Sequence, residues 1–303
     1  MDVEIKKKDG STYRLSDYGV VYDFVVHSIT IDNYTERIEG RSGFVDYGAD
    51  YGSRRITVPM KFKHLDMHGY AHVRDELYGV LTDIESYHIR EMRRPKRLEY
   101  EFVDFGQEPK FKKQTENRYV GGKQYLVRMV SEISPEQMYN GGEIEIEFET
   151  TELPFAETMY TTLDLSESGL DDAKSVYGLS DNINDELSVY RFTENEFTIW
   201  NGGNVPITPE NMYLNIAVKE LRGVTNGDFT IENTTTKDKF MYLRSFSSAN
   251  DLVLDGVMVT LSGLNRLAGS NREFITIAPG ENKFKISGGT FKEISFDFKY
   301  VYK

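Results

Sequence analysis

Hydrophobic and polar residues alternate along much of the first 62 residues, with a period of two. Apolar side chains at every second position are typical of β-strands that bury one face. The alternation is clearest in residues 3–7, 22–31 and 54–62. Turn residues separate these segments, including the glycine-spaced stretch EGRSGFVDYGADYGSR at 39–54. We therefore expect a β-rich beginning.

The period then changes to that of a helix. Between about 66 and 85, apolar residues recur on one stripe of a helical wheel, with charged residues off that stripe. The stripe comprises Tyr70, Val73, Leu77, Val80, Leu81 and Ile84. The spacing predicts one amphipathic helix over 66–85.

Strand patterns return at 93–105, 124–138 and 141–155, and in the last of these Ile and Phe alternate with Glu. The intervening charged stretch EPKFKKQTENRYVGGK has ends that could pair. We expect an extended arm hairpin over about 103–125, reaching toward a neighbour. Residues 1–155 would then form one domain with a single main helix.

The second half of the chain begins with a change of composition. Residues 156–190 are rich in Ser, Asp, Asn and Thr without a sustained period, so we expect a linker there. Residues 191–303 contain about nine short strand patterns between turns, which is typical of a β-sandwich or jelly roll. The predicted class is mainly β with one main helix (α+β), in two domains.

Composition supports two packed cores without disulfides. The chain has 303 residues, 39% of them hydrophobic and 13% aromatic, and it has no cysteine. Thiol catalysis and cysteine zinc sites are therefore excluded. No apolar run approaches the length of a membrane span, and the amino end lacks the apolar core of a signal peptide. We expect synthesis in a cytoplasm and no membrane insertion.

Charge limits the range of partners. A net charge of −13 argues against a general nucleic-acid surface. The exception is a basic cluster formed by Arg90, Arg93, Arg94, Lys96 and Arg97. It could be a phosphate or acidic-partner site, or a solvated or subunit-contacting face, and the second interpretation is favoured.

Candidate chemistry is sparse. His64, His68 and His72 are spaced for one helix face, but that face lies opposite the apolar stripe and no carboxylate completes a metal motif. Residues 164–175 resemble a calcium loop, yet Ser175 stands where a bidentate Glu is needed. No nucleophile elbow or phosphate loop is present, and a spatial carboxylate pair stays open. We predict no catalytic residue, cofactor or metal, and hence no enzyme.

The only tryptophan lies in FTIWNGGNVPITPENMYLNI, residues 197–216. We expect Gly202 and Gly203 to adopt positive φ in a tight turn, and the prolines that follow to interrupt strand pairing. Trp200 could pack in a core or stack on a sugar, and packing is favoured. Trp200 and Tyr213 are the candidate carbohydrate contacts.

This stretch, with ITIAPGENKFKISGG at 275–289, resembles the carboxy-terminal half of the siphophage distal tail protein family. Residues 38–62, the segment RDELYGVL at 74–81 and ELPFAET at 152–158 are similar to its amino-terminal half. The resemblance extends in order over nearly the whole chain, whereas residues 103–125 match only in character. Each motif is short, so the resemblance depends on the order and spacing of the motifs together.

The resemblance implies a structural virion protein of a long-tailed, non-contractile bacteriophage. The family forms a homohexameric ring at the tail tip, with amino-terminal domains around a DNA channel and galectin-like carboxy-terminal sandwiches outside. Its partners are the tail tube protein, a tail-associated lysin or tail fibre protein, and receptor-binding proteins. Segment 103–125 would be the arm. The expected interface residues are Arg93, Arg94, Lys96, Arg97, Lys110, Lys112 and Lys113.

Two other functions stay open. A carbohydrate-binding module that contacts the host wall would expose aromatic side chains on the sandwich. A wall-degrading hydrolase would need paired carboxylates in a cleft, and no motif points to one.

Overall fold

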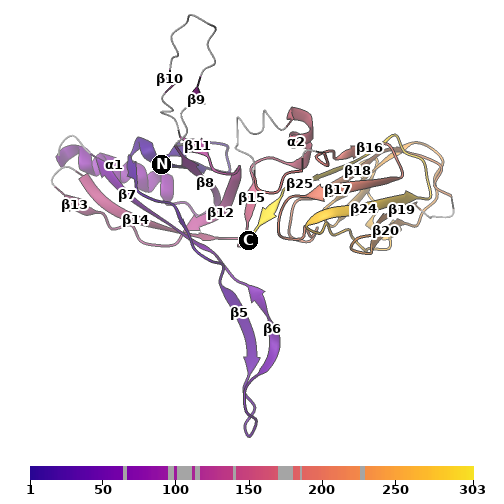
Figure 1. Cartoon of the computed structure of the whole chain (residues 1–303), viewed down its shortest axis with the longest axis horizontal. Coiled ribbons are helices and arrows are strands. Elements are labelled where there is room, and N and C mark those ends of the chain that lie inside the picture. The colour runs from indigo at the N-terminus through magenta and orange to yellow at the C-terminus, as the bar shows by residue number, and fades with distance from the viewer. Residues whose placement is uncertain are drawn as a thin grey trace, which may run out of the picture. The chain divides into compact units, whose positions relative to one another are not determined.

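Strands dominate the chain in a computed structural model, which divides into two units, Met1–Ala156 and Glu157–Lys303 (Figure 1). The structure describes residues 1–63, 67–94, 99–100, 111–112, 117–138, 141–169, 180–184, 186–225 and 229–303. Two α-helices and two short 3-10 turns occur in these residues. The prediction of a mainly β protein is confirmed.

The first unit is built on one antiparallel sheet with the strand order β2-β1-β8-β12-β14-β7-β3. Its elements are β1 (Asp2–Lys6), β2 (Thr12–Arg14), η1 (Leu15–Asp17), β3 (Gly19–Val21), β4 (Val25–Val26), β5 (Ile31–Glu36), β6 (Val45–Tyr51), β7 (Arg55–Lys63), α1 (Met67–Leu81), β8 (Tyr87–Arg93), β9 (Glu99–Tyr100), β10 (Phe111–Lys112), β11 (Arg118–Tyr119), β12 (Lys123–Met129), β13 (Glu136–Met138) and β14 (Gly141–Thr150).

Strand β14 shows why the alternating pattern folds this way. Ile144, Ile146 and Phe148 are buried, while Glu143 and Glu145 are exposed between them. Pairing runs along β7 from Gly141 opposite Lys63 to Glu149 opposite Arg55. Because strand side chains alternate between faces, the apolar set enters the core and the glutamates stay outside it.

Helix α1 packs the predicted stripe into the same core. Tyr70, Leu77, Val80 and Leu81 are buried there. The helix ends at Leu81, so Ile84 lies beyond it and is 89% exposed. Its assignment to the buried stripe was therefore wrong, because the apolar spacing continues past the residue at which the helix stops.

The second unit is a β-sandwich. Its sheets have the orders β16-β25-β18-β21-β22-β23 and β17-β24-β19-β20. Phe284 of β24 and Phe296 of β25 pack between the sheets, with ring centroids 4.7 Å apart. The elements are β15 (Ala156–Thr158), α2 (Thr162–Ser168), β16 (Arg191–Phe192), β17 (Glu196–Asn201), β18 (Leu214–Leu221), β19 (Phe229–Asn233), β20 (Asp238–Tyr242), β21 (Asn250–Asp255), β22 (Met258–Leu261), β23 (Leu264–Asn265), η2 (Leu267–Gly269), β24 (Gly280–Ser287), β25 (Glu293–Phe298) and β26 (Val301–Tyr302).

Part of the expected linker has regular structure. Helix α2 begins with a capping box, in which the side chains of Thr161 and Asp164 each accept from the other's backbone N–H. Thr162 Oγ1 donates to the carbonyl of Phe296 at 2.9 Å, which ties α2 to the sandwich. Most of the calcium-like loop, from residue 170, lies outside the described residues.

In the segment 275–289, Ile277 forms an isolated bridge with Ile207, and β24 begins at Gly280. No helix among the described residues is long and apolar enough to cross a membrane.

Candidate functional site

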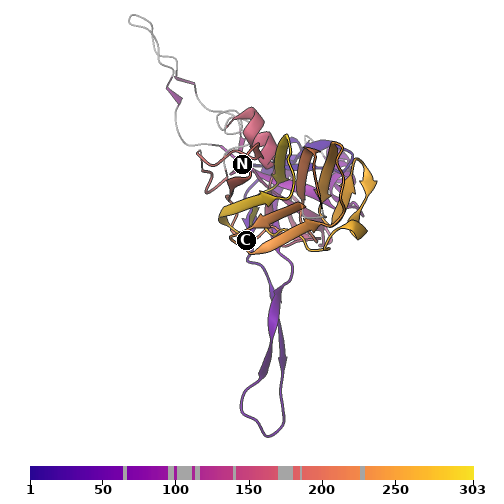
Figure 2. The same cartoon turned by 90° about the vertical axis from the view of Figure 1, so that its right-hand side faces the viewer.

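A hairpin of β5 and β6 projects from the first unit in both views (Figure 1, Figure 2). The glycine-spaced stretch expected to be a turn forms its second strand, so that expectation was wrong. The strands pair from Ile31 opposite Tyr51 to Glu36 opposite Val45, with one irregularity of register. At the base, Thr30 N donates to the Ser53 carbonyl at 2.9 Å, and Ser53 N donates to Thr30 Oγ1 at 2.9 Å.

The hairpin has no core of its own. Every residue from 31 to 51 except Val45 is exposed. Six large apolar side chains are among them: Ile31, Tyr34, Ile38, Phe44, Tyr47 and Tyr51. A two-stranded hairpin alone in water is marginally stable, and clustered exposed aromatic residues mark interaction surfaces. The hairpin is therefore the main candidate assembly surface.

Carboxylates accompany these aromatic rings. The Tyr47 hydroxyl donates to Glu36 Oε2 at 2.8 Å, and this bond to a carboxylate raises the pKa of Tyr47. A hydrogen bond with Asp50 raises the pKa of Tyr34 in the same way. The surface that the hairpin offers is thus both apolar and acidic.

The basic cluster is divided by the structure. Arg90 is buried, with Nη1 2.8 Å from Glu4 Oε1, so it does not belong to an exposed basic face. Arg93 is exposed and pairs with Glu91 and Asp23. Arg94 is also exposed. Lys96, Arg97, Lys110 and Lys113 lie outside the described residues, as does the side chain of Lys112, and the interface role of the set stays a prediction.

The predicted arm over 103–125 lies mostly outside the described residues. Its last part belongs to the body of the unit, because β11 pairs with β8 and β12 begins at Lys123 within the main sheet. Strand β10 pairs with β9. The predicted end of the arm at residue 125 was therefore wrong.

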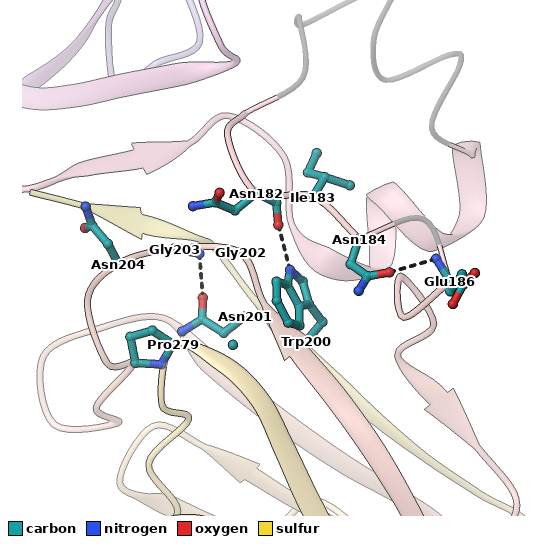
Figure 3. A pocket seen from close by; sticks show the side chains of 11 residues that line it. Asn182, Ile183, Asn184, Glu186, Trp200, Asn201, Gly202, Gly203, Asn204 and Pro279 are labelled. Carbon is teal, nitrogen blue, oxygen red and sulfur yellow. Dashed lines mark hydrogen bonds between the residues drawn. The ribbon is translucent and has the colours of Figure 1, made fainter.

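Trp200 lines an open pocket of about 880 Å³ in the second unit (Figure 3), here called the indole pocket. The lining residues are Asn182, Ile183, Asn184, Glu186, Trp200, Asn201, Gly202, Gly203, Asn204, Pro279 and Gly280. Trp200 Nε1 donates to the Asn182 carbonyl at 2.7 Å. Tyr213 does not line this pocket, and its hydroxyl donates to Asp297 Oδ2 at 2.7 Å. The two candidate carbohydrate contacts are not brought together.

Gly202 and Gly203 of the indole pocket allow close packing and do not supply a left-handed backbone conformation. Neither Gly202 nor Gly203 has a positive φ, so that expectation was wrong. A Cβ at Gly203 would lie 2.5 Å from the Val301 carbonyl oxygen, and one at Gly202 would lie 2.9 Å from the Tyr300 ring. The backbone therefore approaches the last strand too closely for a side chain.

The side chain of Asn201 forms hydrogen bonds with backbone groups of the same turn. It is 1% exposed, its amide donates to the carbonyls of Val205 and Ile277, and its Oδ1 accepts from Gly203 N at 2.9 Å (Figure 3). The polar atoms of Asn201 and the indole nitrogen of Trp200 thus have partners within the protein.

The histidine series forms no metal site that the structure describes. His72 is exposed on α1, whereas His64 and the side chain of His68 lie outside the described residues. No group of three or more metal-ligating side chains occurs in the described part of the chain.

Comparisons with known proteins agree with the fold. The family model of the phage tail protein RIFT-related domain matches residues 8–150. Over 98% of this chain and 99% of the other, the fold is similar to the crystal structure of SPP1 Dit, described as a paradigm of the hub adsorption apparatus in phages infecting Gram-positive hosts, with a TM-score of 0.61 and 12% identity. A phage P2 baseplate chain in its activated, calcium-bound conformation matches with a TM-score of 0.39 and 7% identity over 99% of this chain and 97% of that one. No curated protein matches the chain in sequence.

The first unit therefore matches a phage tail protein domain over residues 8–150, and the whole chain has a fold similar to that of SPP1 Dit. Both findings agree with the resemblance to the siphophage distal tail protein family seen in the motifs. The hairpin was missed, although Val45, Tyr47 and Tyr51 follow the period of a strand. Alternation normally signals one buried face, and here neither face is covered.

Proposed function

We propose that this chain is the hub protein of a siphophage tail tip and assembles into a homohexameric ring around the DNA channel. The ring joins the tail tube protein to a tail-associated lysin or tail fibre protein, and receptor-binding proteins attach to it. Its place is the virion, at the tail tip. Its role is structural rather than enzymatic.

The β5–β6 hairpin is the observation that carries this proposal. Its six large apolar side chains are 46–66% exposed, and the ring of Tyr51 lies 5.6 Å from the ring of Phe155. Burying them against the next copy removes that surface from water, at roughly 25 cal/mol per Å² of apolar area. A contact between different surfaces of neighbouring copies closes into a ring when the rotation allows it.

The charge of the hairpin suits a protein through which DNA passes. Acidic side chains do not bind the phosphate backbone, because affinity for DNA comes from Lys and Arg. Asp32, Glu36, Asp46 and Asp50 line the two strands. A neighbour's basic residues would complement them, and Arg93 and Arg94 are the exposed members of the predicted interface set that the structure describes.

The test replaces two exposed apolar residues of the hairpin, Phe44→Ser with Tyr47→Ser, and measures mass by light scattering over a concentration series. We expect closed rings for the natural chain and monomers for the variant. The control is Val257→Ser with Met258→Ser, an adjacent exposed apolar pair in the second unit, which should leave the rings intact.

To test ring formation on the neighbouring tail proteins as well, the same chains are mixed with the tail tube and lysin proteins. A natural chain that stays monomeric both alone and with these partners contradicts the proposal. Equal assembly of the natural chain and the hairpin variant shows that the hairpin is not the contact.

A further inference from the structure

A second pocket of the sandwich has a different chemistry. It has a volume of about 460 Å³ and lies where β20 ends near β22, β23 and η2. Strands β20 and β23 are edge strands of the two sheets. We call it the arginine pocket, and its main lining residues are Tyr242, Arg244, Ser245, Asn265, Arg266 and Gly269.

Tyr242 lines the pocket, and within the described residues its hydroxyl forms no hydrogen bond. The hydroxyl oxygen is not among the buried side-chain atoms that lack a partner, so it reaches the opening of the pocket and can donate to a ligand there. A Cβ at Gly269 would lie 3.3 Å from Tyr242 Cε2 and 3.2 Å from Arg244 Cγ. The phenol end and the arginine stem therefore lie side by side over Gly269, at the wall of the pocket.

Neighbouring residues hold this tyrosine ring in place. Phe246 meets it edge-on, with centroids 6.0 Å apart, and Tyr242 bridges to Ser270 through the backbone. A phenol that is fixed in this way at the wall of a pocket can donate to a bound acceptor with little further loss of conformational freedom.

The two arginines add unneutralised positive charge. Arg244 and Arg266 are exposed, and within the described part of the chain neither forms an ion pair. No acidic residue lines the pocket. By contrast, Arg191 and Arg222 of the same unit each pair with glutamate. In a chain of net charge −13, two unpaired guanidinium groups at one pocket are a local exception.

The remaining polar groups are donors as well. Asn265 Oδ1 already accepts from Leu267 N at 3.1 Å, which leaves its amide N–H groups for a ligand. Ser245 adds a hydroxyl. A neutral sugar would need acceptors as well as donors, and no carboxylate lines the pocket to supply them.

We propose that the arginine pocket binds a phosphate ester, through Arg244, Arg266 and the hydroxyl of Tyr242. A phosphate group has several terminal oxygens, which can accept from two guanidinium groups and a phenol together, whereas a carboxylate is satisfied by one forked arginine. This site is independent of ring assembly, because it uses residues of the second unit alone.

The test titrates the full-length chain with glycerol 3-phosphate, followed by calorimetry at constant ionic strength, with inorganic phosphate and glycerol as parallel probes. We expect glycerol 3-phosphate to bind and glycerol not to bind. Inorganic phosphate binding as tightly as the ester identifies free phosphate as the ligand, and weaker binding identifies an ester carried on a larger molecule. Absence of binding by both phosphates overturns the proposal.

Variants locate the site. Arg244→Gln with Arg266→Gln should weaken binding at least about tenfold, since the charge-assisted hydrogen bonds of both guanidinium groups to the phosphate are lost. Tyr242→Phe should weaken it severalfold while the chain stays folded by circular dichroism. The matched control, Lys283→Gln with Lys285→Gln, removes the same charge from the exposed side of β24 and should bind normally. Equal binding by the arginine variant and the control overturns the proposal.

Discussion

The indole pocket and the arginine pocket lie along opposite edge strands of one sheet, β17 and β20, and they use their polar groups in opposite ways. In the indole pocket, Asn201 and the Trp200 nitrogen bond to the protein itself. In the arginine pocket, Tyr242, Arg244 and Arg266 leave their donors open. The polar groups of the indole pocket therefore stabilise the turn that forms its wall. The arginine pocket instead has the hydrogen-bond donors that a ligand requires.

The largest effect should come from Gly203→Ala in the indole pocket. The new Cβ would lie 2.5 Å from one backbone atom of Val301 and 2.7 Å from another, and backbone cannot move aside as a flexible side chain can. We expect a loss of about 3 kcal/mol in the free energy of unfolding. Denaturation in urea, followed by the fluorescence of the single tryptophan, measures it.

The control for this variant is Gly79→Ala in helix α1, where nothing lies within 4 Å of the new Cβ. It should be neutral or stabilising, since alanine favours a helix over glycine by about 1 kcal/mol. Equal stability of the Gly203→Ala variant and the natural chain would mean that the turn is not packed as described.

A smaller effect is expected from Trp200→Phe. It removes the indole N–H that bonds to the Asn182 carbonyl, and we expect a loss of about 1 kcal/mol, measured by thermal unfolding. The same residue tests the carbohydrate-binding alternative. Neutral oligosaccharides should leave the tryptophan fluorescence of the natural chain unchanged. Saturable quenching of this fluorescence would show that the indole pocket also binds a ligand, and it would favour a sugar site at Trp200.

The smallest effect on stability should come from Arg244→Gln with Arg266→Gln. Both side chains are exposed and unpaired among the described residues, so unfolding should shift by less than about 0.5 kcal/mol. Their loss should instead appear in phosphate-ester binding. A large loss of stability would mean that the arginines hold the fold, and the two pockets would then differ less than proposed.

The sequence alone predicted those helices and strands whose regularly spaced apolar residues are buried in the structure. Strand β14 and helix α1 follow their periods closely, since Ile146 and Leu77 each enter the core. The prediction that Ile84 is buried was wrong, because periodicity does not show where a helix ends. The hairpin was not predicted, because Tyr47 and its neighbours alternate as in a strand although no core lies beneath them.

The details of the sites depend on contacts between distant residues. Gly203 looked like a turn glycine, but its constraint comes from Val301. Arg244 and Arg266 belong to no sequence motif. They line the same pocket because the edge strands β20 and β23 of the two sheets lie near each other there. A local signal was overlooked in α2, where Thr161 and Asp164 have the spacing of a capping box.

The position of β26 affects the order in which the chain can fold during synthesis. Strand β26 pairs with β15, Thr158 N donates to the Tyr300 carbonyl at 3.0 Å, and Val301 lies against Gly203. The second unit therefore cannot close until residues near 300 have left the ribosome, whereas the main sheet of the first unit needs only residues up to about 150. Pairing across so long a separation is also slow. The hairpin would consequently be exposed on a nascent chain before the sandwich is complete, and premature contact between chains on one messenger would be the hazard of this arrangement.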